Sequence, residues 1–270
     1  MKYVIKTTAP RRVPFDLSRD LNPQQRAVVE APKGEILVLA GAGTGKTRTL
    51  TYRVARLVAG GVHPERILLV TFTNRAAREM TARVEELLGI DMRRSAAGTF
   101  HHVGNRILRK YGHALGLCQS FGILDPEDAR TLLAGEIAKQ GLAALSRRRF
   151  PTPKVLSNLI SLATGTRRPL RKIVEERKLK LLDRAPMMED VAKAYAKRKR
   201  DMNLVDFDDL LGLWAELLEN PDHRAIAGEL RDSYDHVLVD EYQDINALQG
   251  SICDLMAAEH GSLVCVGDDA

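Results

Sequence analysis

The chain has 270 residues, of which 44% are hydrophobic and 28% are charged, as in an ordinary globular protein. No apolar run approaches the ~20 residues of a membrane span, and the N-terminus carries charges and prolines where a signal peptide would be apolar. The three cysteines (Cys118, Cys253 and Cys265) fit neither a disulfide framework nor a zinc pattern. Cys253 and Cys265 lie in apolar stretches typical of reduced core residues. We therefore expect a cytoplasmic protein with no membrane partner.

The net charge of +6 is unevenly distributed. Residues 111–200 contain 19 Lys and Arg against 9 Asp and Glu, whereas the rest of the chain has 22 against 26. Binding to a phosphate backbone is the natural physical use of such an excess. A helical surface with solvated charges is the alternative for any single run, such as Arg147-Arg148-Arg149.

The first part of the chain predicts a strand, a glycine-rich loop and a helix. Residues 1–20 show little periodicity and are interpreted as an N-terminal arm. A helix is expected to begin at Asn22 and Pro23, with Gln25 placed to close a capping box. A buried strand at 36–40 then runs into the loop 41–45. The helix that follows has one apolar face and stops at the glycine pair 60–61.

Further strands are expected at 67–70, 237–239 and 263–266. Each is continuously apolar, and the first is followed by a helix with Ala76, Met80, Val84 and Leu87 on one face and Gly89 at its end. Apolar strands without alternation, separated by helices, indicate a parallel sheet covered on both sides. From about 111 to 202 the strand signal disappears and proline-punctuated helices replace it. We predict an α/β sheet domain formed by residues 21–110 and 203–270, interrupted by an all-helical, basic insertion at 111–202.

The loop after the first strand has the composition of a phosphate cradle. Its glycines let successive backbone N–H groups point at phosphate oxygens, at the positive end of the following helix. Lys46 would reach the β and γ phosphates, and the Thr47 hydroxyl would ligate Mg²⁺. The usual pattern opens with Gly, whereas this chain has Ala40 there. A chance glycine-rich turn is the alternative, and the Lys-Thr pair argues against it.

Two adjacent carboxylates follow the strand at 237–239. Asp240 would hold Mg²⁺, and Glu241 is the candidate base that deprotonates the attacking water. A solvated helix N-terminus is the alternative for an isolated Asp-Glu pair. Together with the phosphate loop, the pair predicts a nucleoside triphosphatase.

The order of the motifs resembles the N-terminal part of superfamily 1 DNA helicases of the UvrD/Rep/PcrA type. The matching blocks are Leu21–Gln25, Ala40–Arg48, Thr71–Met80, Gly98–His101, Asp206–Leu211, Asp240–Asp244 and Gly267–Asp269. The resemblance implies a RecA-like P-loop fold, ATP and Mg²⁺ as cofactors, and single-stranded and duplex-junction DNA as partners. It also implies 3′→5′ translocation in DNA repair or replication, in a bacterial cytoplasm beside the nucleoid.

The resemblance extends the set of expected site residues. It makes Gln25 an adenine contact, where spacing alone favours a helix cap, and it places Arg48 beside the base and sugar. The nucleotide-binding residues are then Gln25, Ala42, Gly43, Thr44, Gly45, Lys46, Thr47 and Arg48. The DNA contacts that it implies are Phe72, Thr73, Asn74, Phe100, His101 and Phe207. Without the resemblance, Phe72 would be interpreted as a core residue at a strand end, and Asp206 as the cap of a helix closed by Asp209.

Two other functions stay open. A helicase–nuclease of the AddA/RecB kind shares these motifs, and a non-catalytic switch would bind ATP and DNA without strand separation. Glu241 argues against the switch, which has no need of a base. The chain ends inside the family's third motif, so we expect a fragment that lacks the second motor domain and its arginines. The isolated chain is therefore expected to be essentially inactive.

Overall fold

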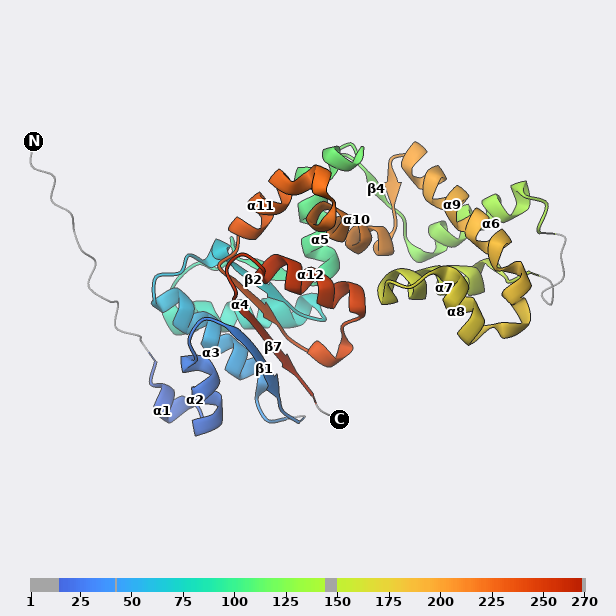
Figure 1. Cartoon of the computed structure of the whole chain (residues 1–270). Helices are drawn as coiled ribbons and strands as arrows, with labels where there is room; N and C mark the ends of the chain where they lie inside the picture. Colours follow the sequence, from blue (N-terminus) through green and yellow to red (C-terminus); the bar gives the residue numbers. More distant parts are fainter. Residues whose placement is uncertain (1–14, 42, 144–149, 269–270) are drawn as a thin grey trace, which may run out of the picture. The chain divides into compact units, whose positions relative to one another are not determined.

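The computed structural model describes residues 15–41, 43–143 and 150–268. A five-stranded sheet has the strand order β1-β7-β6-β2-β3, and every neighbouring pair is parallel (Figure 1). The strands are β1 (Glu35–Leu39), β2 (Ile67–Val70), β3 (Ala96–Gly98), β6 (His236–Val239) and β7 (Leu263–Gly267). Because they all run the same way, the residues after their carboxyl ends share one edge of the sheet. The predicted α/β class and parallel sheet are confirmed.

One face of this sheet is packed by two long helices, α3 (Lys46–Ala59) and α4 (Asn74–Leu88). Both end where the sequence predicts, α3 at Gly60 and α4 at Gly89, which takes the left-handed conformation (φ 63°). The apolar core between helices and sheet consists of Leu50, Val54, Ala55, Ile67, Leu69, Met80, Val84, Met92, Leu238, Val264 and Val266. Every residue of β2, β6 and β7 is buried, so these strands are covered on both faces, as expected of a parallel sheet.

The first strand departs from the prediction of a buried strand. Leu37 and Leu39 are 58% and 60% exposed, whereas Ile36 and Val38 pack against the core. The physical reason is position: in the described sheet β1 lies at the edge and pairs with β7 alone, so only one of its faces is packed. An apolar run in the sequence indicates a strand but does not indicate whether that strand lies at the centre or at the edge of the sheet.

The described chain divides into two compact units. The first holds the five-stranded sheet and takes the residues up to Val103, Gly228–Ile245 and the residues from Cys253 onward. The second takes Gly104–Ala227 and Asn246–Ile252. The insertion expected at 111–202 falls within the second unit, which also includes flanking residues on both sides. The remaining elements of the first unit, some shared with the second, are α1 (Leu17–Asp20), α2 (Pro23–Glu30), η1 (Pro64–Arg66), α5 (Phe100–Tyr111), α11 (Arg224–Asp232), η5 (Tyr242–Asp244) and α12 (Ala247–Ala257).

Helices build the second unit. Its elements are η2 (Gly112–Leu115), β4 (Gly122–Ile123), α6 (Pro126–Lys139), α7 (Pro153–Thr166), α8 (Leu170–Arg177), η3 (Leu179–Arg184), α9 (Ala185–Asp201), β5 (Leu204–Val205), α10 (Phe207–Glu219) and η4 (Pro221–His223). Helices α6 to α9 enclose an apolar core of their own, which includes Leu133, Leu156, Ile173 and Met188. Pro126, Pro153 and Pro186 lie in the first turn of their helices, where a missing N–H costs nothing.

The prediction of an all-helical insertion needs one correction. Strand β4 lies inside it and pairs in parallel with β5, which follows the last helix of the insertion. The Gly122 N–H donates to the Asn203 carbonyl (3.0 Å), and the Leu124 N–H donates to the Val205 carbonyl (2.8 Å). Two residues per strand are too few for a periodic signal. Their bonds hold together the two ends of the helical segment.

Within the part of the chain that the structure describes, no helix combines the length and apolarity needed to cross a bilayer. The cysteines lie as expected from their surroundings: Cys253 and Cys265 are buried, and Cys118 is exposed. Burial raises the pKa of the Cys265 thiol to about 12. The two buried cysteines are therefore core thiols, as predicted.

A buried histidine at the start of β6 couples folding to pH. Its ring is 8% exposed, and Nδ1 lies 2.7 Å from the Ser262 hydroxyl. Burial lowers the pKa of His236 to about 4, with smaller effects in the same direction from Lys33 and Arg53 that Asp235 opposes. The unfolded chain takes up this proton near pH 6.5 and the folded chain only near pH 4. Stability is therefore lost as the pH falls through that window.

The free energy of unfolding of the wild type should fall between pH 7 and pH 5. We predict that this fall is about 2 kcal/mol smaller in His236→Asn. Urea unfolding at the two pH values measures this difference. The matched control is His63→Asn, because the His63 side chain is 62% exposed and should leave the pH dependence unchanged. Equal pH dependence in wild type and His236→Asn would contradict the prediction.

Candidate nucleotide site and DNA contacts

The loop between β1 and α3 is shaped by glycines in the left-handed conformation. Gly43 and Gly45 have φ values of 77° and 86°, which residues with a Cβ rarely adopt. The Thr44 hydroxyl donates to the Gly41 carbonyl (2.7 Å) and fixes the turn. The predicted contact Ala42 lies outside the described residues. The loop delivers the chain to the N-terminus of the 14-residue helix α3, where backbone N–H groups attract an anion.

Gln25 caps a helix and also touches the phosphate loop. The capping box with Asn22 is present, as spacing predicts, with both of its hydrogen bonds between 2.8 and 3.0 Å. The Gln25 Nε2 also donates to the Thr44 carbonyl (2.9 Å). A Cβ on Gly45 would lie 2.7 Å from this nitrogen, so glycine permits the approach. The two interpretations of Gln25 are therefore compatible, since the cap places the amide beside the loop.

Arg48 lies two residues beyond Lys46 on the first turn of α3. Its guanidinium lies 5.5 Å from the centre of the Tyr52 ring, a cation–π distance. The exposed side chain is held on the helix surface near the loop.

The lysine of the loop forms an ion pair with a residue at the end of β7. Lys46 Nζ lies 2.8 Å from Asp268 Oδ2, and both side chains are largely buried, at 10% and 17% exposed. The hydrogen bond to Asp268 raises the pKa of Lys46, with weaker contributions from Glu241 and Asp240. Asp268 lies within one of the matching motif blocks, but its contact with Lys46 could not be predicted from the sequence, because the two residues are 222 positions apart. Parallel pairing of β1 with β7 creates it.

Thr47 and Asp240, the two predicted metal ligands, meet in the structure. The Thr47 hydroxyl donates to Asp240 Oδ2 over 3.2 Å, and Asp240 is only 3% exposed. Octahedral Mg²⁺, with oxygen ligands at ~2.1 Å, separates adjacent ligands by about 3 Å. Burial raises the pKa of Asp240, and the neighbouring Glu241 carboxylate adds to this shift. A buried carboxylate and a hydroxyl at this spacing fit Mg²⁺, which commonly keeps waters in its other positions.

Glu241 occupies an unusual backbone conformation. Its φ and ψ of 54° and 48° are left-handed, which costs a non-glycine residue about 1–2 kcal/mol. Its N–H donates to Asp240 Oδ1 (3.1 Å), and its carboxylate accepts from Gln243 Nε2 (2.7 Å). The two adjacent acidic side chains have different partners: Asp240 accepts from Thr47, while Glu241, the N-cap of the 3-10 turn η5, accepts from Gln243.

The DNA contacts expected in the first unit follow β2 and β3, which are neighbours in the sheet. Phe72 is 65% exposed, so it is not the core residue that a strand-end phenylalanine suggests. Thr73 caps α4 through its hydroxyl (3.1 Å from Ala76 N), and Asn74 is exposed beside it. Phe100 differs: at 5% exposed its ring belongs to the core and cannot stack on a base from there. His101, next to it, is partly exposed.

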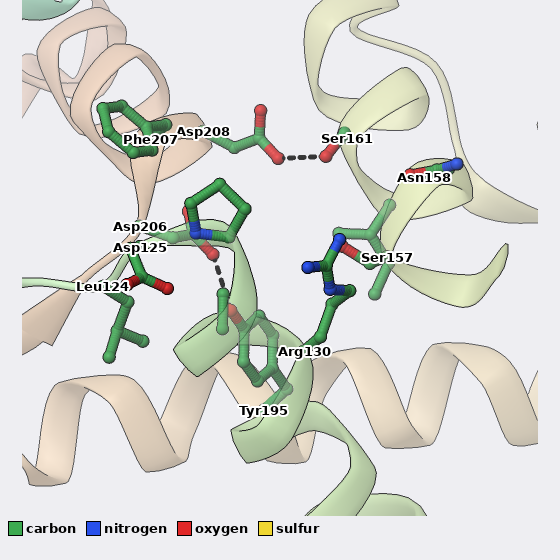
Figure 2. A pocket seen from close by; sticks show the side chains of 13 residues that line it. Leu124, Asp125, Arg130, Ser157, Asn158, Ser161, Tyr195, Asp206, Phe207 and Asp208 are labelled. Atoms are coloured by element: carbon green, nitrogen blue, oxygen red, sulfur yellow. Dashed lines mark hydrogen bonds between the residues drawn. The ribbon is translucent and has the colours of Figure 1, made fainter. Parts of the chain in front are cut away.

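Phe207 belongs to the second unit, at the start of α10. The ring is 44% exposed and borders a cavity of about 200 Å³ whose lining side chains Figure 2 shows. Asp208 accepts a hydrogen bond from Ser161, and Tyr195 donates to Asp206 (2.8 Å). The capping box of Asp206 with Asp209 is present, so that alternative is confirmed for Asp206.

Beneath this cavity lies a buried charge cluster. Lys199, 4% exposed, pairs with both Asp206 and Asp209. Burial alone would raise the pKa of Asp206, but the Lys199 ammonium outweighs it and the net shift is downward. Burial and the Asp206 charge together raise the pKa of Asp209. One positive charge of the basic segment is therefore neutralised by buried carboxylates inside the protein.

Two glycines of the phosphate loop allow a matched test of the Gln25 contact. Both Gly43→Ala and Gly45→Ala introduce a Cβ at positive φ, at a cost of about 1–2 kcal/mol. Only the Cβ at 45 displaces the Gln25 amide, since nothing lies within 4 Å of a Cβ at 43. We predict that Gly45→Ala lowers the free energy of unfolding, measured with urea, by about 1 kcal/mol more than Gly43→Ala does. In a Gln25→Ala background the two variants should become equal, and a persisting difference would refute the contact.

Comparison with known proteins places these features in a family. The chain matches the family described as UvrD/REP helicase N-terminal domain over residues 21–270. It is 38% identical over 259 residues to the ATP-dependent DNA helicase PcrA of Leuconostoc citreum, a match covering 93% of this chain and 33% of that protein. DNA helicase II of Escherichia coli strain K12 is 36% identical over 255 residues, covering 92% and 33% respectively.

A third relative, the probable DNA helicase II homolog of Rickettsia felis, is 37% identical over 273 residues, covering 94% of this chain and 38% of that protein. The chain thus spans about a third of the length of the curated relatives it matches. The motif order, the parallel sheet and the geometry of the phosphate loop agree with this match. The chain belongs to the UvrD/REP helicase N-terminal domain family.

Proposed function

We propose that this chain is the first motor domain of an ATP-dependent DNA helicase that translocates on single-stranded DNA. One observation carries the proposal: the carboxyl edge of a single parallel sheet brings Lys46, Thr47 and Asp240 together, with Glu241 next in the chain. A phosphate grip, a magnesium site and a base for water are what hydrolysis of a nucleoside triphosphate requires. The names of the relatives support ATP as the nucleotide and DNA as the substrate.

Each residue then has a role set by its position. The phosphates are held by the backbone N–H groups of Gly43, Thr44 and Gly45 and by the Lys46 ammonium. Lys46 therefore gives up its ion pair with Asp268 and contacts the β and γ phosphates. Thr47 and Asp240 would hold Mg²⁺, which would supply positive charge to neutralise the phosphates. Glu241 takes a proton from water as the water oxygen bonds to the γ phosphorus and the bond to the leaving oxygen breaks. Gln25 contacts the adenine edge, and Arg48 lies beside the base and sugar.

DNA binds, in this proposal, along the half of the edge formed by β2 and β3. The exposed Phe72 offers a stacking surface for a base, a contact that tolerates any sequence. Thr73 and Asn74 follow it directly in the chain, and His101 follows the neighbouring strand β3. In this proposal all three contact the DNA strand through polar groups. In the second unit Phe207 offers another exposed ring. Phe100 is omitted, because its ring is buried.

The complete motor needs more than this chain. The relatives are about three times longer, which supports a second motor domain in the same parent protein. That domain would supply arginines, and an arginine added to a phosphoryl-transfer site is worth about 10³–10⁵ in rate. We further propose 3′→5′ polarity, action on duplex junctions in repair or replication, and a place beside the nucleoid of a bacterial cytoplasm. The organisms of the relatives support a bacterial cytoplasm, and their names support DNA as the substrate; polarity, pathway, junction and nucleoid rest on the family resemblance alone.

Substitutions of one basic and one acidic residue of the site should distinguish nucleotide binding from hydrolysis. Lys46→Ala in the parent protein should weaken Mg·ATP binding and abolish turnover, because the phosphates lose their cation. Glu241→Gln should keep nucleotide affinity and lower turnover by about 10² or more, as for loss of a general base. Fluorescent-nucleotide titration and phosphate release measure the two quantities. Normal turnover by Glu241→Gln would refute the base, and no turnover by the wild type would favour the non-catalytic switch.

The basic segment predicts a salt-dependent contact with DNA. Arg177, Lys178 and Lys180 are exposed around the junction of α8 and η3. Replacing all three with Ala should weaken the salt dependence: the magnitude of the slope of log affinity against log salt concentration should fall by about 2 on single-stranded DNA. The matched control removes the same charge from the first unit, with Arg83, Arg93 and Arg94 replaced by Ala. Equal slopes for the two triple variants in fluorescence anisotropy would show that the segment is only a solvated surface.

A further inference from the structure

One amide side chain joins the catalytic carboxylate to the neighbouring strand. Gln243 Nε2 donates to Glu241 Oε2 over 2.7 Å. On the other side of the same amide, Oε1 accepts from the backbone N–H of Asp268 over 2.8 Å. Gln243 lies in the 3-10 turn η5 after β6, and Asp268 follows β7, so the amide spans the ends of two adjacent strands.

The orientation of this amide is determined by its two partners. A carboxylate only accepts hydrogen bonds and a backbone N–H only donates one. The Gln243 nitrogen must therefore face Glu241, and its oxygen must face Asp268. The reversed amide would set oxygen against carboxylate and nitrogen against N–H, losing both bonds.

The adjoining backbone is shaped to admit the side chain. A Cβ on Gly267 would lie 3.0 Å from Gln243 Oε1 and 3.3 Å from Tyr242 Cβ. Glycine at the end of β7 thus lets the turn approach the strand. The same Asp268 whose N–H meets Gln243 uses its carboxylate to pair with Lys46. A short chain of contacts therefore runs from the phosphate lysine through Asp268 and Gln243 to Glu241.

Glu241 needs such a constraint if it is to act as a base. The side chain is partly exposed, and a glutamate has three rotatable bonds, whose restriction costs entropy of about 1–2 kcal/mol. A base must stay within hydrogen-bond reach of the water it deprotonates. A bond from Gln243 to one carboxylate oxygen restricts the rotamers and leaves the other oxygen for that water.

We propose that Gln243 is a positioning residue for hydrolysis: it holds the Glu241 carboxylate and ties it to the end of β7. The inference rests on the proposed function, since it requires Glu241 to act as the base. Gln243 touches neither nucleotide nor water in this assignment. Its loss should lower kcat and leave the KM for ATP nearly unchanged.

The experiment compares three variants in the parent protein by steady-state ATP hydrolysis. Gln243→Met removes both hydrogen bonds at similar length, and kcat should fall about tenfold, as for one lost hydrogen bond of about 1.4 kcal/mol. Gln243→Glu keeps an acceptor for the Asp268 N–H but sets a second negative charge beside Glu241, so kcat should fall at least as far. The control is Gln140→Met, at the exposed end of α6 in the second unit, which should leave kcat unchanged.

Amide hydrogen exchange at Asp268 gives a readout that does not depend on activity. Exchange should accelerate in Gln243→Met, which loses the acceptor, and stay slow in Gln243→Glu, which keeps it. Low kcat in both variants with this split in exchange would support positioning. Wild-type kcat in Gln243→Met would overturn it while leaving the proposed function standing. A wild-type parent protein that hydrolyses no ATP would overturn the proposed function and this inference with it.

Discussion

The parallel ladder of the five-stranded sheet is the constraint on which the site depends. Hydrogen bonds set Leu39 opposite Gly267 and Val239 opposite Cys265, so β1 and β7 end level with each other and β6 ends two residues earlier. Lys46, Thr47, Asp240, Glu241 and Asp268 each follow one of these ends. Lys46 meets Asp268, and Thr47 meets Asp240, because the ladder brings together segments about 200 residues apart in sequence. Antiparallel pairing would send half of these groups to the opposite edge.

The local elements were predictable because their signals are local. Glycine at 60 and 89 stops two helices, Asn22 and Asp206 each begin one, and apolar runs mark the central strands. The proximity of Thr47 and Asp240, which we propose as Mg²⁺ ligands, was expected from the chemistry of the two motifs. What the sequence could not specify is set by neighbours in space. Exposure of Leu39 depends on strand order, and burial of Phe100 depends on the residues that cover it in space, so neither can be predicted from the local sequence pattern.

The basic segment shows the same limit for charge. Counting residues treats Lys199 as part of the positive excess, yet its ammonium is buried between Asp206 and Asp209, which lie outside the counted range. A buried ion pair contributes little net stability but leaves a costly charge if one partner is removed. Lys199 therefore joins α9 to the start of α10, next to the β4–β5 pair, instead of binding a phosphate. The charges of Arg177, Lys178 and Lys180, by contrast, lie at the surface.

The nucleotide site works against the stability of the sheet that holds it. Asp240 is buried beside a second carboxylate, its pKa is raised by both effects, and Glu241 has left-handed backbone dihedrals. Both features cost folding free energy, as is common where geometry serves chemistry. Thr47 donates one hydrogen bond to Asp240, and Lys46 is drawn instead to Asp268, so neutralisation within the protein is incomplete. A bound cation would complete it, and a ligand that binds only the folded state stabilises that state. Occupancy of the site and stability of the sheet are thereby linked through the same carboxylate.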